Sequence, residues 1–158
     1  MEILLFDFFI NHGSRRVRVR VSGLLIEHDA LLLIAHKKRG KVYWLLPGGG
    51  MNYGESMTRA LEREFREELG VTVNVHDPMF IGDSIDPRGR RHILNVTFRC
   101  TYREGEYLLG RDRRLYDFGF FKKEEIPDKL LYPPINSTLV SILNNKKSEL
   151  YLGSLWLV

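Results

Sequence analysis

Residues Gly49 to Val71, GGMNYGESMTRALEREFREELGV, decide the fold of this chain. They place a glycine-rich turn directly before a helix that carries Glu64, Glu67 and Glu68. Residues three and four apart share one face of a helix, so we expect these carboxylates to converge on one patch. Like charges at this spacing destabilise a helix unless a cation lies between them. Because oxygen ligands favour Mg²⁺ or Mn²⁺ over zinc or copper, the stretch predicts a divalent metal site.

Length and composition indicate one globular domain. The 158 residues suffice for a substantial core, and we expect a single domain over residues 1–158. One cysteine, Cys100, excludes an internal disulfide and favours a reducing, cytoplasmic compartment. The apolar start, MEILLFDFFI, contains Asp7 and is too short to span a bilayer, so no membrane association is expected.

The chain is basic, with a formal net charge of +4 and a pI of about 9.3. A basic protein attracts phosphate-bearing partners, which include nucleic acid and small polyphosphates. Fourteen of the 24 lysines and arginines fall into four short groups, at residues 15–20, 37–41, 88–91 and 111–114. None of these groups is the long tail typical of a nucleic-acid arm, and most of them are expected to form a solvated positive surface. An RNA-processing role is the less favoured alternative.

Periodicity predicts strands on both sides of the central helix. The expected strands cover residues 15–27, 31–35, 42–46, 71–75, 80–84, 92–102 and 118–122. The helix covers about 55–69, with Leu61, Phe65 and Leu69 as its core stripe and Gly70 as its C-terminal stop. A last helix is expected to begin at Pro134. This order predicts a mixed sheet covered by helices on its faces.

Both ends of the chain are apolar. Residues 4–10 and 151–158 carry many large apolar side chains, whereas free termini are usually polar and mobile. Either these segments complete the core or they pack on a partner chain. We favour a homodimer.

The spacing of the central stretch matches a known pattern. It reads Gly49, five residues, Glu55, seven residues, Arg63-Glu64-Phe65, one residue, Glu67-Glu68, one residue, Gly70-Val71. This stretch, residues 49–71, resembles the Nudix box with every defining position filled. The resemblance implies an α/β fold, an α/β/α sandwich around a central mixed sheet. It also implies hydrolysis of compounds in which a nucleoside diphosphate is linked to another group.

The resemblance implies a role for each residue type. The three helix glutamates form the expected metal set, the carbonyl of Gly48 is a further ligand, and Glu64 is also one candidate base. Arg63 and Glu55 are expected to pair and brace the loop against the helix. Metal ions held there would neutralise a pyrophosphate and lower the pKa of a bound water.

Family members usually need one more acid from a loop beyond the box. The loop at residues 105–117 offers Glu106, Asp112 and Asp117, with Glu104 just before it. We favour Asp112 and place Asp117 second. In relatives this loop is often rich in glutamate, whereas here it reads GRDRRLYDF. Alternatively, the arginines of this loop form a clamp for phosphate or carboxylate.

A second resemblance lies in the loop after Ser84, which reads DPRGR over residues 86–90. A similar stretch occurs in some ADP-ribose pyrophosphatases of the Nudix family. Its role would be a rigid turn that presents Arg88 or Arg90 to a terminal phosphate or ribose. The alternative is an ordinary surface turn.

The function predicted from the sequence is a cytoplasmic, Mg²⁺-dependent Nudix hydrolase. Its leading substrate is ADP-ribose, which would give AMP and ribose 5-phosphate. The enzymatic alternatives are a nucleoside triphosphate pyrophosphohydrolase and a diadenosine polyphosphate hydrolase. A non-catalytic nucleotide-sensing module on the same fold is the alternative of another class, disfavoured because the box is whole.

Overall fold

The structure is a computed structural model, and it describes residues 16–156. Its elements in chain order are β1 (Arg18–Glu27), β2 (Ala30–Lys38), β3 (Lys41–Leu45), β4 (Gly48–Gly50), α1 (Met57–Leu69), β5 (Val71–Ile85), β6 (His92–Gly105), β7 (Leu115–Lys122), α2 (Asn136–Leu143) and β8 (Tyr151–Ser154). Within residues 16–156, no helix combines the length and the apolar character needed to cross a bilayer.

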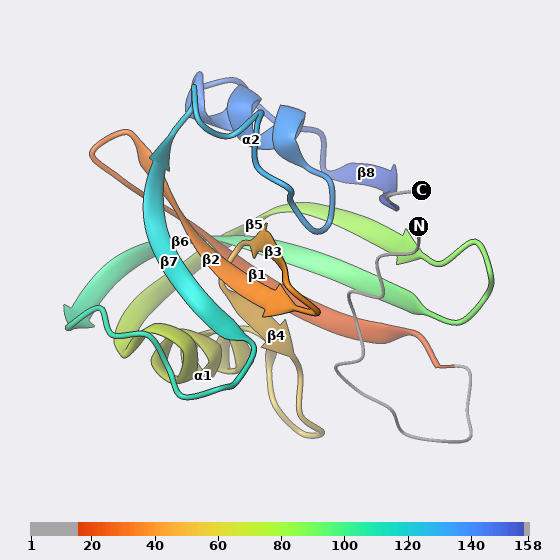
Figure 1. Cartoon of the computed structure of the whole chain (residues 1–158), viewed down its shortest axis with the longest axis horizontal. Coiled ribbons are helices and arrows are strands. Elements are labelled where there is room, and N and C mark those ends of the chain that lie inside the picture. Colours follow the sequence, from red (N-terminus) through yellow and green to blue (C-terminus); the bar gives the residue numbers. More distant parts are fainter. Residues whose placement is uncertain (1–15, 157–158) are drawn as a thin grey trace.

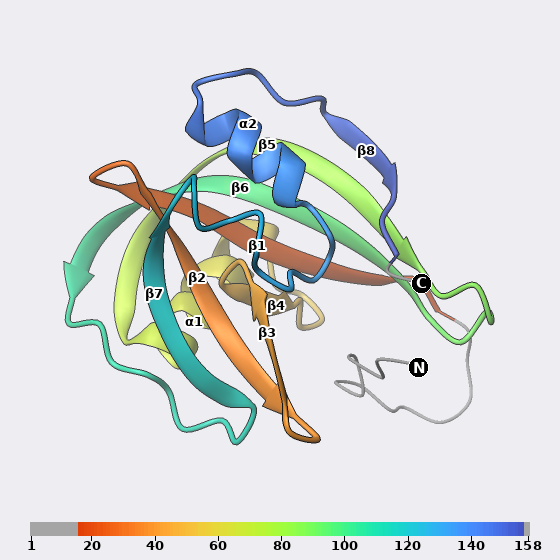
Figure 2. The ribbon, with the colours of Figure 1, turned by 45° about the horizontal axis from the view of Figure 1, so that its top comes forward.

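The eight strands form one mixed sheet with helices on both faces (Figure 1). The order is β3-β2-β1-β6-β5-β8, with β4 paired to β1 and β7 paired to β2. β1 runs parallel to β6 and antiparallel to β4. α1 lies on one side of the sheet and α2 on the other (Figures 1 and 2). The predicted α/β/α sandwich with a mixed sheet is confirmed.

α1 packs on the sheet through its predicted apolar stripe. Leu61, Phe65 and Leu69 are all fully buried. The Oγ atom of Ser56 accepts a hydrogen bond from a backbone N–H of the first turn and caps the helix. Gly70 ends it with a φ of 70°, a left-handed conformation that glycine adopts without a steric cost. These two caps fix where the helix glutamates stand.

A second part of the core lies under α2. Leu139 of α2 is fully buried, and the C-terminal Leu152 and Leu155 pack against the same cluster. β8, which contains Leu152 and ends directly before Leu155, pairs in parallel with β5. The described part of the apolar C-terminal segment thus completes the core of its own chain. The apolar segment at residues 4–10 lies outside the described residues, and the homodimer stays a prediction.

Two strands differ from the sequence prediction. The strands expected at 71–75 and 80–84 are one strand, β5, whose pairing with β6 is irregular around Pro78. Proline cannot donate to a ladder, so it interrupts the pairing there. The glycine turn also forms a short strand, β4, against β1. A Cβ atom at Gly48 would overlap the carbonyl oxygen of Val21, so this close pairing requires glycine.

Candidate active site

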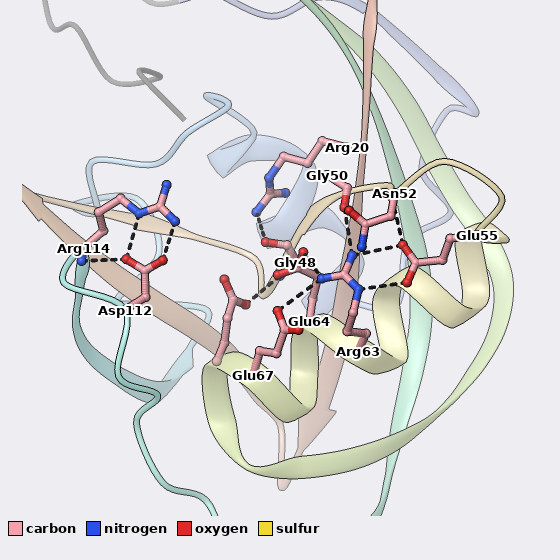
Figure 3. Close-up of polar contacts among 11 residues, drawn as sticks. Arg20, Gly48, Gly50, Asn52, Glu55, Arg63, Glu64, Glu67, Asp112 and Arg114 are labelled. Carbon is pink, nitrogen blue, oxygen red and sulfur yellow. Dashed lines mark hydrogen bonds and ion pairs between the residues drawn. The ribbon is translucent and has the colours of Figure 1, made fainter. Parts of the chain in front are cut away.

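The glutamates of α1 face a cavity of about 320 Å³. Its walls come from the loop between β4 and α1, from α1 itself, from the end of β2 and from the loop before β7. The lining residues are His36, Gly50, Asn52, Arg63, Glu64, Glu67, Glu68, Asp112, Arg114 and Leu115. The structure therefore brings Asp112 to the same cavity as the three box glutamates of the expected metal set, Glu64, Glu67 and Glu68 (Figure 3).

Glu68 is the buried carboxylate of this cavity. It is 8% exposed, and its Oε2 atom accepts a hydrogen bond from the N–H of Gly48 at 2.9 Å. Burial raises the pKa of Glu68 to about 8, and the nearby charge of Glu64 adds to the rise, while Arg20 opposes it. A carboxyl of this kind favours its neutral form until a cation arrives.

Arg63 holds the loop and the helix together. Its Nε and Nη2 atoms donate to the two carboxylate oxygens of Glu55, at 2.8 and 3.0 Å. Nη2 also donates to the carbonyl of Gly50 at 3.0 Å. The hydrogen bond from Arg63 lowers the pKa of Glu55 to about 2. Arg63 and Glu55 thus lie in the contact that the sequence led us to expect.

Arg63 also lies between Glu64 and Glu67. Its Nη1 atom donates to Glu64 at 2.8 Å and to Glu67 at 3.1 Å. Across residues 16–156, no three acidic, histidine or cysteine side chains are grouped closely enough to hold a metal ion as they stand. The convergence expected from helical spacing is therefore incomplete, because Glu64 and Glu67 turn to Arg63 while Glu68 turns to Gly48.

The donor atoms nevertheless fit a hard divalent cation. All are carboxylate or carbonyl oxygens, the ligands that Mg²⁺ and Mn²⁺ prefer. A Cβ atom at Gly49 would overlap the carboxylate of Glu64, so the glycine leaves that carboxylate its place against the backbone. The Gly48 carbonyl accepts one hydrogen bond, from Arg20 at 3.2 Å, and a carbonyl oxygen has two lone pairs. A bound cation would also offset the unfavourable burial of Glu68.

Sequence reasoning missed Arg20 and His36. Arg20 was read as part of a solvated basic group, yet its Nη2 atom donates to the carbonyls of Leu46 and Gly48, at 3.0 and 3.2 Å. Burial lowers the pKa of Arg20, and Glu68 and Glu64 oppose that effect. His36 is 7% exposed on the cavity wall, and burial lowers its pKa to about 4. The alternation of arginines with valines over residues 15–21 predicted a strand but did not single out Arg20.

Asp112 lies on the cavity wall opposite α1, and Arg114 holds it there (Figure 3). Its Oδ1 atom accepts from the backbone N–H and the Nε of Arg114, at 2.9 and 2.8 Å. Its Oδ2 atom accepts from Nη2 of the same arginine. These hydrogen bonds lower the pKa of Asp112. Asp117, the second choice, lies outside the cavity lining, and its carboxylate accepts the N–H of Phe118.

The DPRGR loop forms the tight turn between β5 and β6. Asp86, the first residue of this turn, is 3% exposed. The carboxylate of Asp86 accepts the backbone N–H of Arg88 at 2.9 Å and the Nε of Arg90 at 2.6 Å. Neither arginine lines the cavity. The structure thus gives Asp86 the role of shaping the turn, and substrate contact by Arg88 or Arg90 stays a prediction.

Comparisons with known proteins agree with this geometry. The family model described as NUDIX domain matches residues 15–140. An ADP-ribose pyrophosphatase of Methanocaldococcus jannaschii is 31% identical over 101 residues, which cover 63% of this chain and 60% of that protein. The nucleoside triphosphatase NudI of Escherichia coli is 29% identical over 123 residues, which cover 70% of this chain and 86% of that protein.

The fold also matches solved structures of NUDIX hydrolases. A NUDIX hydrolase from Nitrosomonas europaea superimposes with a TM-score of 0.73 at 21% identity, covering 84% of this chain and 91% of that one. The family model, which extends over most of the chain, carries the assignment. This chain belongs to the NUDIX domain family.

Proposed function

We propose that this chain is a metal-dependent pyrophosphohydrolase that cleaves a phosphoanhydride in a nucleoside diphosphate derivative. One observation carries the proposal: three box glutamates and Asp112 line a single cavity beside the glycine backbone of β4. A cluster of carboxylates next to backbone without side chains suits a metal-bound pyrophosphate. A solvated acidic surface would not require Glu68 to be buried.

The expected cofactor is Mg²⁺ or Mn²⁺, held by Glu64, Glu67, Glu68 and the carbonyl of Gly48. When bound, such an ion neutralises phosphate charge and lowers the pKa of a coordinated water. Glu64 is one candidate to accept the proton of the attacking water as its oxygen bonds to phosphorus. The anhydride bond then breaks, and the leaving phosphate takes the electron pair.

Other residues position these groups. Arg63 keeps its two hydrogen bonds to Glu55, so it still braces the loop when Glu64 and Glu67 turn away from it. Arg20 holds the carbonyls of Leu46 and Gly48 and fixes the backbone on which the phosphates would lie. Both arginines therefore hold the groups of the site in position.

The leading substrate is ADP-ribose, with AMP and ribose 5-phosphate as products. Two observations support it: the name of the archaeal relative and the DPRGR sequence of the β5–β6 turn. We propose that Arg88 or Arg90 contacts the distal ribose or phosphate when substrate binds.

A nucleoside triphosphate is the second candidate. NudI supports it by name, and a feature beside the cavity supports it physically. The basic β2–β3 hairpin, residues 37–41, adjoins the basic loop at 111–114, where the N–H of Lys37 donates to the carbonyl of Arg114 at 2.9 Å. The hairpin tip and this loop lie side by side in both views (Figures 1 and 2). Cations gathered there suit an additional phosphate.

The test is a hydrolysis panel in Mg²⁺ with ADP-ribose, nucleoside triphosphates, diadenosine polyphosphates and 5′-triphosphorylated RNA. We expect the largest kcat/KM for ADP-ribose and loss of turnover by orders of magnitude in Glu67→Gln. A preference for triphosphates would select the second candidate. No turnover of any anhydride, with a folded protein, would refute the proposal and favour a nucleotide-sensing module.

We also expect a cytoplasmic protein that acts as a homodimer. Sedimentation of the purified chain tests the dimer directly: a monomeric mass at micromolar concentration would contradict it.

A further inference from the structure

Asp112 and Arg114 form a closed pair on the cavity wall. Three hydrogen bonds join them, and they occupy both carboxylate oxygens of Asp112. Both residues line the same cavity as Glu64, Glu67 and Glu68. Figure 3 shows the pair beside the glutamates, on the loop before β7. As it stands, the pair keeps Asp112 from joining the carboxylates of α1.

This arrangement has an electrostatic reason. Asp112 is close enough to raise the pKa of Glu68 further, in addition to the effects of burial and Glu64. A fourth carboxylate moved beside the three glutamates would increase that repulsion unless cations were bound. The hydrogen bonds from Arg114 lower the pKa of Asp112 and so favour its charged form at this distance from the glutamates.

The partner of Arg114 can be exchanged. A guanidinium presents a planar fork that matches a carboxylate and a phosphate with the same two-bond geometry. A phosphate that enters the cavity would compete directly with Asp112 for this fork. Replacing one charged two-bond partner by another keeps the arginine satisfied throughout.

We propose that Arg114 is a phosphate-responsive positioning residue. Without substrate it holds Asp112; with a substrate phosphate in the cavity its guanidinium binds the phosphate and releases Asp112 toward the glutamates. The released carboxylate becomes an additional metal ligand only when the substrate is present. This inference rests on the proposed function, and it specifies how phosphate and metal binding are coupled at the same site.

Thermodynamic linkage makes the proposal measurable without turnover. If phosphate frees a metal ligand, phosphate must strengthen metal binding, and metal must strengthen phosphate binding by the same factor. The probe is Mn²⁺ binding, followed by isothermal titration or by the spin resonance of free Mn²⁺. The phosphate probe is α,β-methylene-ADP, which resists hydrolysis.

The first measurement is substrate-free Mn²⁺ affinity in four proteins. Arg114→Ala should bind Mn²⁺ roughly tenfold more tightly than wild type, because Asp112 is already free. Arg114→Lys retains the charge but not the fork, and it should also bind more tightly than wild type. The gain of Arg114→Ala should vanish when Asp112→Asn is added.

Arg113→Ala is the matched control. Arg113 is the exposed neighbour of Arg114, and within residues 16–156 it makes no ion pair. Its removal changes the local charge by the same amount, and we expect Mn²⁺ affinity within twofold of wild type. An equal gain in Arg113→Ala would show that net charge, and not the release of Asp112, is responsible, and would overturn the inference.

The second measurement is the coupling between α,β-methylene-ADP binding and Mn²⁺ binding. In wild type, α,β-methylene-ADP should strengthen Mn²⁺ binding by a larger factor than in Arg114→Ala. The inference is wrong if both Arg114 variants bind Mn²⁺ like wild type, if the gain persists in the Asp112→Asn background, or if coupling is equal in both proteins. Because none of these readouts needs catalysis, intact coupling without hydrolysis would refute only the proposed function. Hydrolysis without coupling would refute only the inference.

Discussion

Replacing Glu68 by glutamine is expected to stabilise the metal-free protein at alkaline pH while it abolishes turnover. Burial raises the pKa of Glu68 from 4.5 to about 8 in the folded protein. In the unfolded chain the carboxyl regains its ordinary pKa. Between pH 4.5 and 8 the folded state therefore binds more protons than the unfolded state, so stability falls as the pH rises through this window.

The size of the effect follows from the two pKa values. Their separation corresponds to roughly 4 kcal/mol of lost stability by pH 8, and to almost none near pH 4.5. Glutamine has nearly the same shape, carries no charge, and its carbonyl oxygen can still accept the N–H of Gly48. Glu68→Gln should therefore recover most of this free energy at pH 8, a rise in Tm of roughly 10 °C.

The assay is thermal unfolding in EDTA at pH 5 and pH 8. Glu67→Gln is the matched control, because the side chain of Glu67 is 60% exposed and should show little pH-dependent gain. Saturating Mn²⁺ should stabilise wild type and leave Glu68→Gln much less affected. Equal melting temperatures of wild type and Glu68→Gln in EDTA at pH 8 would refute the reasoning.

Three further predictions concern Arg63, Phe65 and Arg88. Arg63→Lys loses the paired hydrogen bonds to Glu55, so kcat should fall roughly 10- to 100-fold while the circular dichroism spectrum stays native; unchanged kcat would contradict the bracing role. Phe65→Ala empties a fully buried site, and urea unfolding should show a loss of roughly 3–5 kcal/mol, whereas a loss below about 1 kcal/mol would place Phe65 outside the core. Arg88→Ala should raise KM for ADP-ribose more than KM for a nucleoside triphosphate, and equal effects would remove the DPRGR turn as a specificity element.

Local patterns predicted the parts of the fold that depend on neighbours in sequence. The spacing of Leu61, Phe65 and Leu69 is enough to define a buried helix face, and Gly70 is enough to end that helix. The resemblance of residues 49–71 to the Nudix box led us to expect the pairing of Arg63 with Glu55. These features need few distant partners, so the sequence contains most of the information that specifies them.

Features that depend on distant pairing were not predictable. β4 exists because residues 48–50 lie against residues 20–22, and this pairing also brings Arg20 to the carbonyl of Gly48. No local sequence pattern predicts either contact. The sequence suggested a carboxylate or phosphate clamp in the loop after β6, but only the structure shows that Arg114 closes on Asp112.

Anomalous diffraction from a crystal soaked in Mn²⁺ tests the central claim most directly. The account predicts an anomalous peak in the cavity within coordinating distance of Glu64, Glu67 and Glu68, with Arg63 retained by Glu55. A soak at saturating Mn²⁺ that leaves Glu64 and Glu67 on Arg63 and Glu68 on Gly48, with no peak among them, would contradict it.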